Sequence, residues 1–236
     1  MEYVLITGAN RGIGLELTRQ YIKHNSSVFV FATCRDPQSA TELNTLAQDH
    51  TDRVEILKLD VTETEMINAT CEQVSQRTDV LDVLINNAGV FFRRDEQRFG
   101  QVTTGIMMDT LRVNTVAPLM ITQAFADHLR RSSKPRVINI SSQLGSIERK
   151  RSGGQYAYCT SKAALNMVTR ALAGDLGHDG VIAVTMHPGW VQTDMGGSAA
   201  SLEAEESAQG MITVIDGLST EDNGTFLSWD GSSLPW

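Results

Sequence analysis

Tyr158 and Lys162 stand four residues apart in the segment Tyr-Cys-Thr-Ser-Lys. On a helix this spacing puts both side chains on one face. A free phenol titrates near about pH 10, which is too high for efficient proton transfer at neutral pH. A neighbouring ammonium group stabilises the phenolate and lowers that pKa. The pair therefore predicts an acid–base centre, although two ordinary residues on a helix surface would show the same spacing.

Two more polar side chains can join this centre. Ser142 follows a β-branched run at 136–141, shortly before the segment that carries Tyr158. If that run is a parallel strand, its carboxyl end opens into the crevice where ligands bind, and the serine hydroxyl can hold a substrate oxygen. Asn114 lies inside a long apolar segment, where it can kink a helix and hold a water. The alternatives are a serine that serves only a turn and an asparagine satisfied within the core.

Residues 7–14, Thr-Gly-Ala-Asn-Arg-Gly-Ile-Gly, follow a predicted strand and open a predicted helix. Glycines there let the backbone turn tightly and approach a pyrophosphate, which the N–H groups at the start of the helix then bind. The glycine spacing differs from the GxGxxG fingerprint, and a glycine-rich turn without a ligand is the alternative. The predicted phosphate contacts are Gly8, Asn10, Arg11, Gly12, Ile13 and Gly14.

The choice of dinucleotide depends on the end of the second strand. Arg35 stands there, and Arg11 of the glycine turn should face the same ribose. Two guanidinium groups near one point favour a 2′-phosphate, and hence NADP(H) over NAD(H). The alternative is that both arginines are solvated, with Asp36 accepting hydrogen bonds from a ribose hydroxyl as in NAD sites.

Three later segments supply the remaining predicted cofactor contacts. Asp60 ends the third strand, where its carboxylate can reach an adenine amino group or merely cap the next helix. Small residues follow the fourth strand, and a Pro-Gly turn follows the sixth. The predicted contacts are Asp60, Val61, Asn87, Ala88, Gly89, Pro188, Gly189, Val191 and Thr193, together with Tyr158 and Lys162.

Short apolar runs alternate with amphipathic segments along the whole chain. The predicted strands are 3–7, 28–33, 54–59, 83–86, 136–141, 182–187 and 224–229, and the predicted helices are 12–24, 38–49, 63–77, 103–131, 155–178 and 200–217. This alternation predicts an α/β fold, a Rossmann-type doubly wound sheet of about seven parallel strands with helices on both faces. We expect a single dinucleotide-binding and catalytic domain over 1–236, with no separate substrate domain. The segments 90–102, 143–155 and 194–202 are the predicted loops over the site.

Composition narrows the function. The chain is 41% hydrophobic with a formal net charge of −8, which argues against a disordered chain and against general nucleic-acid binding. No apolar run is long enough to cross a membrane, and the first residues do not form a secretory signal. The three cysteines and five histidines have no metal-ligand or disulfide spacing. We expect a cytoplasmic protein with no metal site and no membrane or nucleic-acid partner.

These motifs follow one another in a fixed order: the glycine turn, Asp60-Val61, the Asn-Asn-Ala-Gly segment, Asn114, Ser142, the Tyr-Cys-Thr-Ser-Lys segment and the Pro-Gly turn. Together they resemble the short-chain dehydrogenase/reductase family in its non-extended form. The C-terminal part, from His187-Pro-Gly-Trp onward, looks most like the C-factor and Sniffer-type carbonyl reductases.

The resemblance implies an NADPH-dependent oxidoreductase that reduces an aldehyde or ketone to an alcohol. It gives Tyr158 the role of general acid, Ser142 that of polarising the carbonyl, Lys162 that of binding the nicotinamide ribose, and Asn114 that of positioning a water. A homodimer or homotetramer is expected. Since C-factor-like proteins include members tied to signalling, an NADP-binding regulator with little turnover is the alternative. The interval between Ser142 and Tyr158 is longer than is usual in the family, so Ser141 and, more remotely, Ser146 stay open as the serine.

Overall fold

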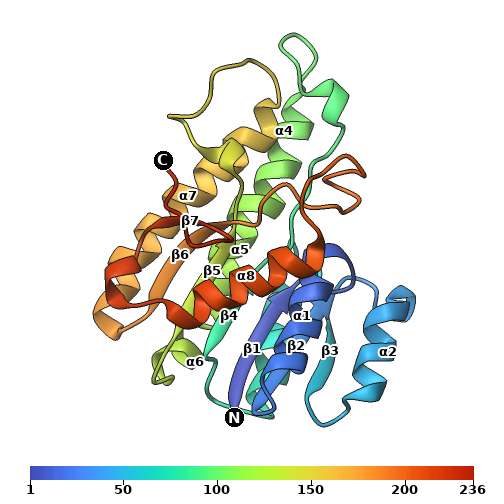
Figure 1. Cartoon of the computed structure of the whole chain (residues 1–236), viewed down its shortest axis with the longest axis vertical. Coiled ribbons are helices and arrows are strands. Elements are labelled where there is room, and N and C mark those ends of the chain that lie inside the picture. The colour runs from blue at the N-terminus through green and yellow to red at the C-terminus, as the bar shows by residue number, and fades with distance from the viewer.

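A computed structural model describes all residues from Met1 to Trp236. One seven-stranded, all-parallel sheet forms its centre, with the order β3-β2-β1-β4-β5-β6-β7 (Figure 1). The predicted Rossmann-type sheet is thereby confirmed. The strands are β1 (Glu2–Thr7), β2 (Val28–Cys34), β3 (Val54–Lys58), β4 (Val83–Asn86), β5 (Arg136–Ile140), β6 (Ile182–His187) and β7 (Phe226–Ser228).

The central strands are apolar on both faces because helices cover both faces. In β1, Val4 and Ile6 pack into one buried cluster, while Leu5 between them packs into the other. In β2, Phe29 and Phe31 lie on the same face as Leu5. Successive side chains of a strand point to opposite faces, so a continuous apolar run fills two cores at once.

Helices divide between the two faces of the sheet. The side chains of α1 (Gly12–His24), α2 (Thr41–Asp49) and α8 (Ala204–Gly217) contribute to the first cluster, and α1 and α8 lie in front of the sheet in Figure 1. The second cluster is covered by α3 (Thr64–Ser75), α5 (Ala117–Ala124), α6 (Ala126–Arg130) and α7 (Tyr156–Leu176). Short 3₁₀ turns complete the structure at η1 (Pro37–Ser39), η2 (Arg94–Glu96), η4 (Gln143–Gly145), η5 (Gly177–Asp179) and η6 (Thr220–Asp222).

The predicted helix 103–131 is not continuous. It consists of α4 (Thr104–Leu111), a π-helical turn η3 (Arg112–Val116), α5 and α6. Asn114 lies in the π turn, so the predicted irregularity at this residue is present. The predicted helix 200–217 also begins later, at Ala204. π turns are rare and occur preferentially at functional sites.

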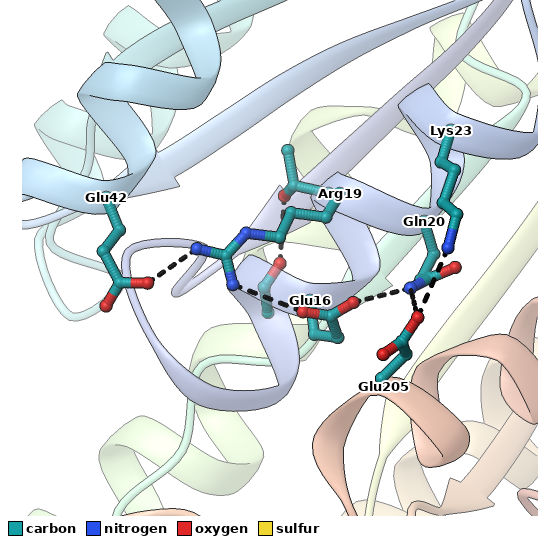
Figure 2. Close-up of polar contacts among 8 residues, drawn as sticks. Glu16, Arg19, Gln20, Lys23, Glu42 and Glu205 are labelled. Atoms are coloured by element: carbon teal, nitrogen blue, oxygen red, sulfur yellow. Dashed lines mark hydrogen bonds and ion pairs between the residues drawn. The ribbon is translucent and has the colours of Figure 1, made fainter.

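A polar network fixes α1 against its two neighbours (Figure 2). Arg19 donates to Glu16 within α1 and to Glu42 of α2, at 3.3 and 2.6 Å. On the other side of α1, Gln20 and Lys23 each donate to Glu205 of α8. The helix that begins at the glycine turn is therefore braced on both sides.

The strand order reverses between β1 and β4. In doubly wound sheets ligands bind at such a switch point, beyond the carboxyl ends of the strands. The glycine turn after β1 and the small residues after β4 meet there. None of the helices is long and apolar enough to span a membrane.

Two helical glycines should respond in opposite ways to the same change. A Cβ at Gly210 of α8 would lie 2.5 Å from the Trp229 ring and 2.7 Å from the Trp229 carbonyl oxygen, whereas a Cβ at Gly174 of α7 would meet nothing within 4 Å. Gly210→Ala should lower the free energy of unfolding by about 1–3 kcal/mol through overpacking. Gly174→Ala should raise it by about 0.5–1 kcal/mol through helix propensity. Urea denaturation of both variants checks this, and a shift of the same sign in both would contradict the packing described here.

Candidate functional site

Two adjoining cavities lie at the carboxyl ends of the strands. The larger, of about 740 Å³, runs from Arg35 to Lys162, and the smaller, of about 360 Å³, lies beyond Tyr158. Tyr158 lines both cavities. The predicted cofactor residues that line the larger one are Gly8, Asn10, Arg11, Gly12, Ile13, Gly14, Arg35, Asp60, Val61, Asn87, Ala88, Gly89, Tyr158, Lys162, Pro188 and Thr193. Gly189, Val191 and Ser142 line only the smaller one, and Asn114 is fully buried behind both.

The glycine turn forms a cradle that larger residues would fill. Gly8 has a φ of +67°, and its Cβ would lie 3.0 Å from the Ala88 Cα. A Cβ at Gly14 would collide with the Gly8 carbonyl oxygen. Arg11 is the N-cap residue of α1, but its side chain accepts no hydrogen bond from the first turn. It therefore does not occupy the free N–H groups there. These features fit the diphosphate of a dinucleotide.

Asn87 joins the end of β4 to the glycine turn. Its side-chain nitrogen donates to the Thr7 and Gly8 carbonyl oxygens at 2.8 and 3.1 Å. The backbone N–H groups of Asn87 and Ala88 donate to the Thr7 hydroxyl at 3.0 and 2.9 Å. The predicted contact Asn87 thus also holds the cradle in shape.

Arg35 and Asp60 lie together at the far end of the larger cavity. The Asp60 carboxylate accepts from the Thr62 N–H and hydroxyl at 3.0 and 2.8 Å, so it caps the turn before α3. Burial raises the pKa of Asp60, but these hydrogen bonds and the charges of Arg35 and Arg112 outweigh it and lower the pKa. Arg35 forms no ion pair within 4 Å, so its guanidinium is available to an anionic ligand.

Arg11 and Arg35 both line the larger cavity, but Arg11 has an ionic partner in this structure. The Arg11 guanidinium forms an ion pair with Asp194 at 2.8 Å, and both side chains are well exposed. Asp194 belongs to the predicted loop 194–202, so the pair spans the mouth of the cavity. Of the two predicted arginines, Arg35 is the one without an ion pair, and it is therefore the one more readily available to a 2′-phosphate.

Tyr158 and Lys162 both lie on one face of α7 and are buried, with 7% and 4% of their surfaces exposed. The Lys162 ammonium donates to the Ile140 carbonyl oxygen at 2.8 Å and lies 5.8 Å from the centre of the Tyr158 ring. No carboxylate pairs with it. The spacing prediction for this pair is therefore correct in geometry.

The expected sign of the Tyr158 pKa shift is wrong. Burial raises this pKa to about 12, and the Ser142 hydroxyl opposes the rise only in part. Burial also lowers the pKa of Lys162 to about 8. In a dry site both groups favour their neutral forms. At neutral pH the phenol therefore keeps its proton, which suits a proton donor.

Ser142 is the serine that faces Tyr158. It lines the smaller cavity, and its oxygen accepts from the Leu144 N–H at 3.1 Å, which caps η4. Ser141 instead donates to Asn166 at 2.8 Å, and Ser146 donates to the Trp236 carbonyl oxygen at 3.1 Å. Both alternative hydroxyls are occupied elsewhere, so the geometry favours Ser142.

Asn114 is satisfied by hydrogen bonds and still positioned toward the site. Its side chain accepts from the Val90 N–H at 2.8 Å and donates to the Val90 carbonyl at 2.9 Å. It also donates to the Ser161 hydroxyl at 3.0 Å. The π turn thus fixes the loop after β4 against α7.

Sequence reasoning missed three residues of the loop 90–102. Phe91 stacks on Tyr158 with ring centres 4.2 Å apart, and the Arg94 guanidinium lies 4.5 Å above Phe91. Gln97 is fully buried, and its side chain accepts from the Tyr158 N–H at 2.9 Å. The loop has no periodicity, so no signal in the sequence marks these residues.

His187 ends β6 beside the smaller cavity, and its Nδ1 has no hydrogen-bond partner. Burial, assisted by the Arg149 charge, lowers its pKa to about 4, although Asp230 opposes this shift. The imidazole is therefore neutral at pH 7. In the unfolded chain the pKa of this histidine is near its ordinary value of about 6.5. The full contribution of neutral His187 to the free energy of unfolding is therefore present above about pH 6.5.

Stability should be lost as the pH falls from about 6.5 to about 4, because only the unfolded chain then gains this proton. The contribution of His187 should be on the order of 3 kcal/mol. His187→Gln should flatten this part of the stability curve in urea denaturation at several pH values. His178→Gln is the control, since 74% of that side chain is exposed. Equal slopes for wild type and His187→Gln would contradict the assignment.

Known proteins resemble all or most of this chain. The carbonyl reductase Sniffer of D. melanogaster is 36% identical, covers 100% of both chains and has a TM-score of 0.96. The NADPH-bound carbonyl reductase from chicken fatty liver is 39% identical, with 100% of this chain and 99% of that chain covered and a TM-score of 0.94. The protein named C-signal of Myxococcus xanthus is 45% identical over 159 residues, which are 67% of this chain and 95% of that protein.

These relatives agree with the predicted resemblance to C-factor and Sniffer-type proteins. The model of the family described as short chain dehydrogenase matches residues 2–204. Together with the parallel sheet and the grouping of Tyr158, Lys162 and Ser142, this match shows that the chain belongs to the short-chain dehydrogenase family of oxidoreductases.

Proposed function

We propose that this protein is an NADPH-dependent carbonyl reductase that converts an aldehyde or ketone to an alcohol. One observation carries the proposal: Tyr158, protonated at neutral pH, lies where the two cavities meet, with Ser142 and Lys162 beside it. We further propose that the single domain 1–236 binds both the cofactor and the substrate. The larger cavity would take the dinucleotide and the smaller one the carbonyl compound.

Several contacts support NADP(H) as the cofactor. The glycine cradle and the start of α1 suit a diphosphate, and the unpaired Arg35 at the far end suits a 2′-phosphate. The chicken carbonyl reductase, which resembles this chain, was crystallised with NADPH. When bound, NADPH supplies the hydride for the reduction.

The side chains of this chain would then manage the proton. Ser142 donates a hydrogen bond to the carbonyl oxygen, and Tyr158 donates its proton to that oxygen as the carbonyl carbon gains the hydride. An unprotonated alkoxide in a dry pocket is costly, so the two transfers develop together. Lys162 holds the ribose hydroxyls of the nicotinamide half and, with a water positioned at Asn114, returns a proton to the phenolate.

A second candidate is an NADP-binding signalling or regulatory protein with little turnover. Its support is the 45% identity to the Myxococcus xanthus protein named C-signal. Against it, all four predicted catalytic positions are filled and three of them line the cavities. NADPH consumption measured across a panel of aldehydes and ketones separates the two. Tight NADPH binding without turnover on any carbonyl would favour the regulator.

We also propose that the protein is a homodimer or homotetramer that pairs through the helices around α4 and α7. Exposed apolar side chains on these helices support this: Met108 is 59%, Val116 48% and Met167 70% exposed. A cytoplasmic location stays a prediction; it accords with three cysteines that are all free.

Tyr158→Phe should lower kcat by about 10²–10⁴-fold because the proton donor is removed. NADPH affinity, measured by fluorescence titration, should change little. The matched control is Tyr156→Phe, since Tyr156 stands on the same helix with 38% of its surface exposed. Near-normal turnover in Tyr158→Phe would refute the role assigned to this phenol.

Arg35→Glu should weaken NADPH binding by about tenfold to a hundredfold, because a charge-assisted contact to the 2′-phosphate is lost. NADH binding should be much less affected. Arg131→Glu, at an exposed position outside both cavities, serves as the control. An equal loss for NADPH and NADH would show that Arg35 does not read the 2′-phosphate.

A further inference from the structure

The smaller cavity beyond Tyr158 contains one charge. Of the side chains that line it, only Arg94 is ionised at neutral pH, since the low pKa of His187 leaves that imidazole neutral. The larger cavity differs, because the carboxylates of Glu42, Asp60, Asp109 and Asp194 line it beside its cations. A substrate in the smaller cavity therefore meets a positive charge with no carboxylate in the lining to neutralise it.

Contacts on two sides hold the Arg94 guanidinium in position. Its Nη2 donates to the Met195 carbonyl oxygen at 2.6 Å, and its central carbon lies 4.5 Å from the centre of the Phe91 ring. A guanidinium has five N–H donors, so most of them stay free after these contacts. Arg94 forms no ion pair, whereas the adjacent Arg93 pairs with Glu96 at 3.5 Å.

Phe91 relates this cation to the reacting group. Its ring stacks on Tyr158 at 4.2 Å with only 11° between the ring planes, and Arg94 lies over the same ring. Phe91 thus contacts both the charge and the phenol ring. The Arg94 charge also acts to lower the pKa of Tyr158, against the larger effect of burial. The same cavity is also lined by the apolar side chains of Leu144, Trp190 and Met195.

We propose that the substrate of this site is a carbonyl compound with an apolar or aromatic middle and a carboxylate at its far end, and that Arg94 binds this carboxylate. The inference rests on the proposed carbonyl reductase function and specifies its substrate class. A carboxylate suits the planar fork of a guanidinium, which can bind it through two parallel hydrogen bonds.

The test compares 4-carboxybenzaldehyde with its uncharged analogue methyl 4-formylbenzoate, with NADPH consumption as the readout. The wild-type protein should reduce the carboxylate with at least about tenfold higher kcat/KM, mainly through a lower KM, since a charge-assisted hydrogen bond contributes that much. Arg94→Met should bring the ratio of the two kcat/KM values close to one. Arg94→Lys, which keeps the charge, should restore part of the preference.

Arg93→Met is the matched control, because Arg93 is adjacent and outside both cavities, and its ratio should equal that of the wild type. A wild-type ratio near one, or an unchanged ratio in Arg94→Met, would overturn the inference while leaving the reductase proposal intact.

If no carbonyl compound is turned over, the proposed function itself fails. Calorimetric binding of 4-carboxybenzaldehyde to the NADPH-loaded protein then decides the inference separately. Weaker binding to Arg94→Met than to wild type would uphold it, and equal binding would overturn it.

Discussion

The hydrogen bonds between Thr7 and the residues after β4 hold the site together. The Thr7 hydroxyl accepts from two successive backbone N–H groups, and Asn87 returns two bonds from its side chain to the glycine turn. Thr7 is 1% exposed, so these bonds are made in an apolar environment, where losing one leaves a buried polar group unpaired. These bonds tie the residues after β4 to the glycine turn, at the carboxyl ends of β1 and β4. The helix α1, which begins at the glycine turn, packs with α2 and α8 in one buried cluster, and ion pairs at the surface add to this packing (Figure 2).

Burial determines the protonation states on which the proposed chemistry depends. Tyr158 and Lys162 are buried so completely that burial moves their pKa values apart, upward to about 12 for the phenol and downward to about 8 for the ammonium group. Their neighbours are mostly neutral: the Ile140 carbonyl, the Ser142 hydroxyl and the Phe91 ring. A phenol with a raised pKa keeps its proton until a strongly basic oxygen forms beside it. Such an arrangement favours delivery of a proton to a developing alkoxide over spontaneous ionisation.

The sequence predicted the elements well because their signals are local. Apolar runs on both faces identify buried strands, so the strands were placed to within one or two residues. The spacing of four positions from Tyr158 to Lys162 sufficed to put them on one helix face. The π turn at Asn114 could be foreseen only as an irregularity, since its form depends on bonds to Val90 and Ser161. The ion pair of Arg11 could not be foreseen because its partner Asp194 is 183 residues away in the chain. Phe91, Arg94 and Gln97 were missed because their contacts with Tyr158 and with one another form only in the folded chain. The direction of the Tyr158 pKa shift depends on burial, which only the assembled fold determines.

The Arg11–Asp194 ion pair has a consequence for the entry of ligands into the larger cavity. It fastens the glycine turn to the segment that follows β6, yet 69% and 77% of the two side chains are exposed. Ion pairs so accessible to water contribute less than about 1 kcal/mol and weaken further as salt screens them. Thermal motion therefore breaks and re-forms this ion pair, and dissolved ions compete for the guanidinium and for the carboxylate. Entry of a long, negatively charged molecule past this pair would therefore depend on ionic strength.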